Sequence, residues 1–165
     1  MKPVAEPDIR LSFVNCSKGE ASRMNLPAGF PELPWDDLDF LGWRDPGAPD
    51  RAYLVAERDG GLVGVTLRAS SGAARSFIAR TMCSFCLTTR TAGGVALMAA
   101  RRRGESGRQG NTVGQYLCTD LSCSLYVRGI RKPAMGADMD ESLSVDGKIA
   151  RTRAHLDAFL DKIIR

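Results

Sequence analysis

The cysteines constrain this chain more than any other feature, because four of the five fall in two closely spaced pairs. Cys83 and Cys86 form a C-x2-C pair, and Cys118 and Cys123 form a second pair after a segment rich in Gly and Arg. Two such pairs can bring four thiolates to one tetrahedral Zn²⁺ ion. The spacing therefore predicts a structural zinc site, with buried thiol pairs or reactive dithiols as the alternative.

The composition is that of an ordinary globular protein. A chain of 165 residues with 44% hydrophobic and 25% charged residues can form one domain with a buried core. No run approaches the roughly 18 apolar residues of a membrane span, and residues 1–11 lack the apolar region of a signal peptide. We therefore expect a cytoplasmic protein with no membrane partner. In that reducing compartment, paired cysteines are more often metal ligands than disulfides.

The net charge of +4 is distributed unevenly along the chain. Residues 72–133 carry 10 basic and 2 acidic side chains, so this middle third alone is strongly positive. A charge of that density around the cysteine pairs favours an anionic partner, either RNA or an acidic protein surface.

The first 50 residues are expected to form a segment that packs on the remainder of a single domain, residues 1–165. Residues 6–25 read as one or two short helices that stop before Pro27, and Cys16 among them is expected to be a half-buried apolar side chain. Residues 27–50 are irregular in pattern but hold large apolar groups, whose exposure would cost about 1.5 to 3 kcal/mol each. We expect them to cover a sheet, with a partner-binding patch as the alternative. These groups are Phe30, Trp35, Phe40, Leu41 and Trp43.

Two β-hairpins and two helices follow from the patterns in the rest of the chain. Residues 52–58 and 62–68 flank an Asp-Gly turn, which predicts a hairpin. Residues 95–100 and 112–117 predict a second one, joined by a basic loop over 101–111. Residues 76–82 predict a short helix or strand before the first cysteine pair. A short helix is expected from Thr119 or Asp120 through Arg128, and a long one over residues 144–164.

The order of these elements predicts the fold class. A C-x2-C knuckle, a β-hairpin and a helix that supplies the last ligands make a treble-clef zinc finger, expected here over residues 80–132. We therefore predict an α+β fold: an antiparallel sheet with a treble-clef finger and a C-terminal helix. Four thiolate ligands leave no open position on the metal.

Features of an enzyme are missing from the sequence. The lone histidine, His155, is expected to face solvent beside the apolar stripe of the last helix. Neither the H-x-E pattern of zinc deaminases nor a P-loop nor a nucleophile elbow occurs. We expect a protein that is not an enzyme and has no small-molecule substrate.

The basic loop is the candidate partner-binding surface. Its glycines expose backbone amides, and its arginines offer planar forks to phosphate or carboxylate groups. A solvated hairpin tip is the alternative, and Phe85 could equally be a contact or a core residue. The candidate contact residues are Phe85, Arg101, Arg102, Arg103, Arg108, Asn111, Tyr116 and Arg128.

The segment around the cysteines also resembles a known family. The run 83–89, the Gly93-Gly94-Val95 triplet, residues 107–114 and residues 118–128 are similar to the elongation-factor-G-binding family, the fusidic-acid resistance proteins of the FusB type. Residues 13–20 and 35–45 resemble the actinobacterial branch, which carries this domain alone.

The resemblance implies that Cys83, Cys86, Cys118 and Cys123 are zinc ligands. It also implies that the protein binds elongation factor G and promotes its release from the ribosome, with a link to fusidic-acid tolerance. The alternative function is a zinc-dependent RNA-binding module associated with the ribosome.

Overall fold

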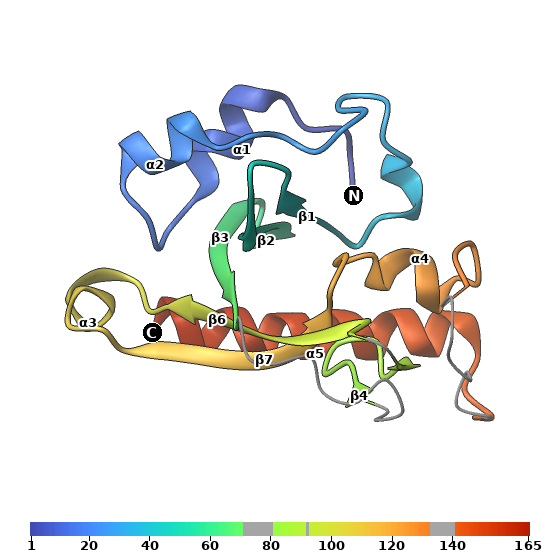
Figure 1. The fold of residues 1–165 in the computed structure, drawn as a ribbon. Coiled ribbons are helices and arrows are strands. Elements are labelled where there is room, and N and C mark those ends of the chain that lie inside the picture. Colours follow the sequence, from blue (N-terminus) through green and yellow to red (C-terminus); the bar gives the residue numbers. More distant parts are fainter. Residues whose placement is uncertain (71–80, 92, 133–140) are drawn as a thin grey trace.

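A computed structural model describes residues 1–70, 81–91, 93–132 and 141–165. Its centre is a five-stranded antiparallel sheet with helices on both faces (Figure 1). The strands lie in the order β1-β2-β3-β6-β7. Their bounds are β1 (Phe40–Asp45), β2 (Ala48–Arg58), β3 (Gly61–Ala69), β6 (Val95–Arg101) and β7 (Thr112–Cys118).

Both predicted hairpins are present. β2 and β3 pair around a tight turn in which Asp59 and Gly60 both have positive φ, a conformation that Asp and Gly adopt more readily than most residues. β6 and β7 pair from Val95 opposite Cys118 to Arg101 opposite Thr112. The two hairpins join over a short stretch, in which Arg68 and Ala69 of β3 pair with Ala99 and Met98 of β6 and the Ser70 amide donates to the Leu97 carbonyl.

The helices and a small second sheet surround this sheet. The N-terminal helices are α1 (Glu6–Ser12) and α2 (Lys18–Arg23), followed by a 3-10 turn, η1 (Trp35–Asp37). A two-stranded ribbon, β4 (Thr81–Met82) and β5 (Thr89–Arg90), frames the first cysteine pair. The remaining helices are α3 (Gly104–Arg108), α4 (Cys123–Val127) and α5 (Val145–Ile164).

The alternation of side chains along β2 separates two hydrophobic cores. Ala52, Leu54 and Ala56 face the core that α5 closes, together with the cysteines and Phe85. Tyr53 and Val55 face the opposite core, which α1, α2 and the loop before β1 cover. In Figure 1 these layers appear as the N-terminal helices on one side and the red α5 behind β6 and β7 on the other. Of the residues expected to cover a sheet, Phe30 and Trp35 pack in this covering layer, whereas Phe40, Leu41 and Trp43 belong to strand β1 of the sheet itself.

The chain after α1 is bound tightly to the sheet. Phe13 and Gly64 form a parallel bridge, and the Val14 amide donates to the Gly64 carbonyl at 2.9 Å. A Cβ at Gly64 would lie 2.4 Å from Ser12 Oγ, so this close approach requires glycine. The Asn15 amide nitrogen then donates to the carbonyls of Thr66 and Arg101, both at 3.0 Å, and so ties β3 to β6.

Three details differ from the sequence-based expectations. The irregular segment 27–50 ends in strand β1, whose side chains are buried at four of six positions and half-buried at the others. The short helix α4 begins at Cys123 rather than near Asp120, because Leu121 at φ +54° still belongs to a turn. Of the predicted element over 76–82, only 81–82 lies in the described residues, where it is a strand. No helix in the described part of the chain is long and apolar enough to cross a membrane.

Candidate metal centre and basic hairpin

The four paired cysteines meet at one buried point between the two ligand-bearing turns. Their sulfur atoms all lie within 4.8 Å of one another, and each residue is at most 4% exposed. Cys83 Sγ lies 3.7 Å from Cys123 Sγ, and Cys86 Sγ lies 3.6 Å from Cys118 Sγ. Tetrahedral zinc with Zn–S bonds of about 2.3 Å requires sulfurs about 3.8 Å apart, so the spacing fits. These cysteines are a structural Zn²⁺ site of the treble-clef type.

The first turn presents its thiols through local backbone geometry. The Leu87 amide donates to the Cys83 carbonyl at 3.0 Å, and the Phe85 amide points at Cys83 Sγ at 3.4 Å. Leu87 has φ +58°, which turns the chain away directly after Cys86. The Ser84 amide donates to the Tyr116 carbonyl at 2.7 Å, so the knuckle is fixed to β7.

Charged groups near the second turn offset the negative thiolates. Arg90 lies 3.3 Å from Asp120 and stacks over the Tyr126 ring at 4.6 Å from its centre. Asp120 also accepts the Tyr126 hydroxyl at 2.6 Å. Burial and this hydrogen bond raise the pKa of Tyr126 to about 12, so it stays a neutral donor. Against the effect of burial, Asp120 and Cys118 both act to raise the pKa of Arg90, so a positive charge lies beside the ligands.

His155 does not face solvent as expected. It is half-buried, and its Nδ1 lies 3.1 Å from the carbonyl oxygen of Phe85 in the knuckle. A carbonyl only accepts, so Nδ1 carries the proton and donates. The histidine therefore ties α5 to the zinc turn, and sequence spacing could not reveal a contact between residues 70 positions apart.

Phe85 is a core residue, and its prediction as a partner contact is wrong. It is 0% exposed and forms edge contacts with Phe40 and Phe159, with ring centres 5.9 and 5.6 Å away. The three rings come from β1, the knuckle and α5. They pack the sheet and the C-terminal helix against the zinc turn.

Replacing Phe85 with Ala is expected to destabilise the zinc-loaded protein by about 3 to 5 kcal/mol, as for other buried Phe side chains. Chemical denaturation at constant zinc measures this. Leu97→Ala is the control, because Leu97 is 38% exposed on the same finger and should cost about 1 kcal/mol or less. Equal effects for the two variants would contradict the core assignment.

Arg128 also has a structural role rather than the predicted contact role. Its guanidinium lies 2.5 and 3.1 Å from the two oxygens of Asp39, whose side chain is 0% exposed. Arg153 of α5 reaches the same carboxylate at 2.8 Å, and the Asp39 amide donates to Ser124 Oγ at 3.0 Å. Asp39 thus joins the start of β1 to α4 and α5. Sequence reasoning missed it, since its partners lie 85 to 114 residues away.

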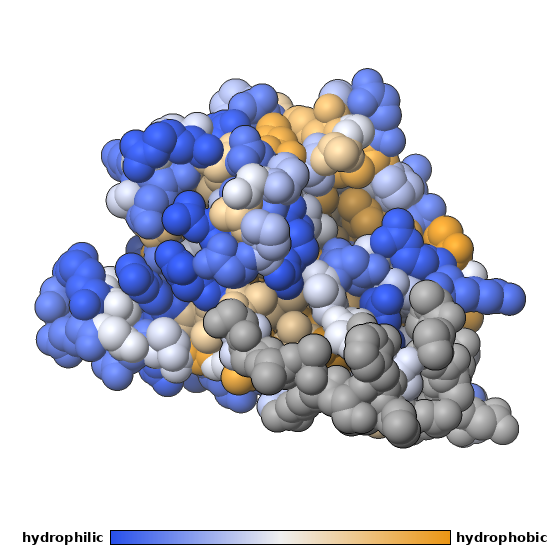
Figure 2. Space-filling view, in the orientation of Figure 1, coloured by the Kyte–Doolittle hydropathy of each residue, from blue (hydrophilic) through white to orange (hydrophobic). Residues whose placement is uncertain are grey.

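The other candidate contacts lie on the β6–β7 hairpin. Arg101, Arg103, Arg108 and Asn111 are exposed, and Arg102 and Tyr116 are half-buried. The connection between the strands is the short helix α3 rather than a plain loop. Figure 2 shows mostly hydrophilic side chains at the end of the molecule that bears α3. The hairpin thus brings four of the predicted contact residues together near its tip: Arg101, Arg102, Arg103 and Arg108.

The tip is a preformed structure. The Arg103 amide donates to the Ile163 carbonyl at 2.7 Å, which anchors the tip to the end of α5. Arg108 pairs with Glu105 at 2.7 Å across the turn of α3. A Cβ at Gly107 would lie 1.8 Å from the Arg102 carbonyl oxygen, so the turn closes only with glycine there.

Comparison with known proteins gives one finding. A family model described as FBP C-terminal treble-clef zinc-finger matches residues 8–163, nearly the whole chain. That match includes the N-terminal helices, both hairpins and α5, in addition to the cysteines. Neither a curated protein nor a solved structure matches.

Proposed function

Because this chain belongs to the FBP C-terminal treble-clef zinc-finger family, the FusB-type zinc fingers, we propose that it binds translation elongation factor G and promotes its release from the ribosome. The observation that carries the proposal is the family match over residues 8–163. In this proposed role, the protein is a non-enzymatic binding module in the cytoplasm. A link to fusidic-acid tolerance would follow from the release of the factor.

The basic tip of the β6–β7 hairpin supports the proposal. Arg103 and Arg108 are exposed there and lie on a turn that is already ordered. A preformed surface loses less side-chain and loop freedom on binding than a flexible one. Arginines at such a tip suit an acidic protein surface, because each guanidinium can form two parallel hydrogen bonds to a carboxylate.

In this proposal zinc acts only through structure. The second cysteine pair follows directly from β7, and the first is tied to β7 through the Tyr116 carbonyl. Metal binding therefore fixes the base of the hairpin, while the Arg103 contact to α5 fixes its tip. The domain as a whole, residues 1–165, presents the surface.

Removal of the two tip charges tests the contact surface. The double variant Arg103→Gln/Arg108→Gln is expected to weaken elongation factor G binding about tenfold or more, which corresponds to about 1.4 kcal/mol. A titration at moderate salt with purified factor measures the dissociation constant. The matched control is Lys2→Gln/Lys18→Gln, which removes two exposed positive charges from the N-terminal segment.

Two results would count against the proposal. If the unmodified, zinc-loaded protein does not retain elongation factor G, the factor is not its partner. Equal weakening by the tip variant and the control would show general charge attraction instead of a contact surface at the hairpin.

A second candidate function is RNA binding, and the 10 basic against 2 acidic side chains over residues 72–133 favour it. This function predicts binding to ribosomal RNA without the factor. The affinity would then fall steeply with salt, with a slope that reflects about four or more phosphate contacts. A salt titration with RNA alone distinguishes the two candidates.

A further inference from the structure

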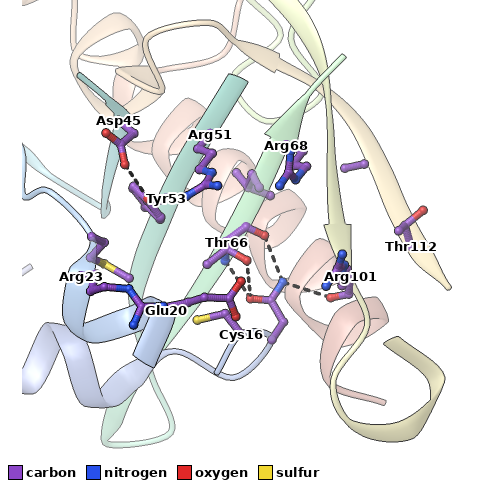
Figure 3. Close-up of a pocket in the computed structure, with 14 residues that line it drawn as sticks. Cys16, Glu20, Arg23, Asp45, Arg51, Tyr53, Thr66, Arg68, Arg101 and Thr112 are labelled. Atoms are coloured by element: carbon purple, nitrogen blue, oxygen red, sulfur yellow. Dashed lines mark hydrogen bonds between the residues drawn. The ribbon is translucent and has the colours of Figure 1, made fainter. Parts of the chain in front are cut away.

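A cavity of about 250 Å³ lies on the opposite face of the sheet from the zinc site. Its walls come from three parts of the chain: the α1–α2 region, the β2–β3 hairpin with the end of β1, and the tip end of the β6–β7 hairpin (Figure 3). The volume lies near the lower end of small-molecule pockets, which span about 300 to 1,000 Å³. Apart from Arg101, which is also a candidate partner contact, the residues that line it take no part in the functions proposed above.

Arginines from neighbouring strands line one side of the cavity. Arg51 of β2 and Arg68 of β3 are direct cross-strand partners, and Arg68 also pairs in register with Ala99 of β6. Arg101 follows two positions after Ala99 and so shares its face of the sheet. Figure 3 shows the three arginines along successive strands. Like charges placed directly opposite each other destabilise a sheet, so this arrangement carries a cost that a bound anion would relieve.

The acidic groups of the cavity are already bonded within the protein. Glu20 accepts from the Ser17 amide and hydroxyl, both at 2.8 Å, as part of the N-cap of α2. Asp45 accepts the Tyr53 hydroxyl at 2.7 Å and the Asn25 amide nitrogen at 3.0 Å. Both carboxylates therefore have neutral donors of their own, while the charge of Glu20 still acts on Arg51 and Arg101 and offsets part of their positive charge.

The arginine side chains, by contrast, remain available for a ligand. Among the described residues, no hydrogen bond or close ion pair engages the guanidinium groups of Arg51 and Arg101, and Glu20 acts on them only through its charge. Arg68 pairs with Asp50 at 3.0 Å, but the two side chains are 65% and 49% exposed. An exposed pair of this kind contributes only about 0 to 1 kcal/mol, so a ligand can compete for it.

The remaining walls are apolar or neutral and held in place. Met24 and Ala99 supply apolar surface. Cys16 also lines the cavity, and burial raises the pKa of its thiol to about 11, which keeps it protonated and unreactive at neutral pH. The hydrogen bonds of Asn15 to β3 and β6 hold this wall against the sheet, so the cavity exists before any ligand arrives.

We propose that this cavity binds a small organic phosphate monoester. Arg51, Arg68 and Arg101 would hold the phosphate, and the surface formed by Met24, Ala99 and Tyr53 would contact the organic group. A dianionic phosphate suits three guanidinium groups better than a single carboxylate does, because one fork satisfies a carboxylate. The ligand is bound and not transformed, since the cavity offers no free nucleophile or base among the side chains named.

Calorimetric titration of the zinc-loaded protein with phenyl phosphate and with inorganic phosphate tests this proposal, at low salt to limit screening. Phenyl phosphate is expected to bind at least about tenfold more tightly than inorganic phosphate, because only it can use the apolar wall. Arg51→Gln and Arg68→Gln are each expected to raise its dissociation constant about tenfold or more. Lys162→Gln, an exposed positive charge on α5, is the matched control and should change it by about twofold at most.

A variant that keeps every charge tests whether binding requires the space of the cavity or only its positive charges. Ala99→Leu fills space beside Arg68 and is expected to abolish phenyl phosphate binding while thermal unfolding stays cooperative. Absence of binding to the unmodified protein, equal weakening in all variants, or equal affinity for both phosphates would overturn the proposal. If Arg51→Gln loses elongation factor G binding and the unmodified protein binds no phenyl phosphate, the cavity would instead receive an acidic side chain of a protein partner.

Discussion

Cys118→Ala is expected to lose zinc completely and to unfold the finger. Cys118 is 0% exposed and its sulfur lies 3.6 Å from that of Cys86, so no other side chain or water can readily take its place. Structural zinc contributes about 10 to 16 kcal/mol in zinc-finger peptides, whereas a whole domain is stable by only about 5 to 15 kcal/mol. Metal analysis of the purified protein, together with near-ultraviolet circular dichroism, measures both effects.

Cys16→Ala is the matched control for that experiment. Cys16 is the one cysteine of the five that lies outside the cluster, on the opposite face of the sheet. The control is expected to keep a full equivalent of zinc and a cooperative unfolding transition. Equal zinc content in the two variants would refute the ligand assignment.

Asp39→Asn is expected to destabilise the protein by about 3 kcal/mol or more. The carboxylate is 0% exposed and lies between Arg128 and Arg153, so its neutralisation leaves the half-buried Arg128 without the charged group to which it is hydrogen-bonded. Denaturant unfolding at pH 7 measures the loss. Glu105→Gln removes a carboxylate from an exposed pair with Arg108 and should cost about 0.5 kcal/mol or less.

The effect of Asp39 should also depend on pH in a defined direction. Burial alone would raise the pKa of Asp39, but the hydrogen bonds and charges of Arg128 and Arg153 outweigh it and lower the pKa below 3.8. The folded state therefore binds this proton less readily than the unfolded state does, and the carboxylate stabilises the fold at pH values above about 4. That contribution is lost as the pH falls from about 4 through the folded-state pKa.

The difference in stability between the unmodified protein and Asp39→Asn isolates this effect. Both proteins lose thiolate ligation to protons in the same way at low pH, so that loss cancels in the comparison. The difference should be constant from pH 5 to 7 and shrink below about pH 4. A difference that stays unchanged down to the acid transition would refute the charged role of Asp39.

Sequence patterns predicted the helices and strands that are determined by residues close together in the chain. The Asp59-Gly60 turn fixes the first hairpin, and the apolar stripe from Ile149 to Ile163 defines α5. β1 was missed because it is covered on both faces, so its side chains show no alternation between polar and apolar. The start of α4 was misplaced because Asp120, a plausible N-cap, binds Arg90 and Tyr126 instead.

The zinc ligands could be predicted because ligand type and spacing are themselves local. The partners of Phe85, Arg128 and His155 could not, because each contact joins residues 45 to 89 positions apart along the chain. The arginine-lined cavity was also beyond sequence reasoning. It depends on the register of β2, β3 and β6, which places residues 51, 68 and 101 on one face.

The ring cluster of Phe40, Phe85 and Phe159 has a consequence for the rate of folding. Its members come from strand β1, the zinc turn and the C-terminal helix, so none of their contacts can form between neighbours in the chain. Proteins dominated by such distant contacts fold in milliseconds to seconds instead of microseconds. We expect the zinc turn to remain loosely organised until those segments meet, so that the metal is exchanged freely early in folding and retained only after collapse.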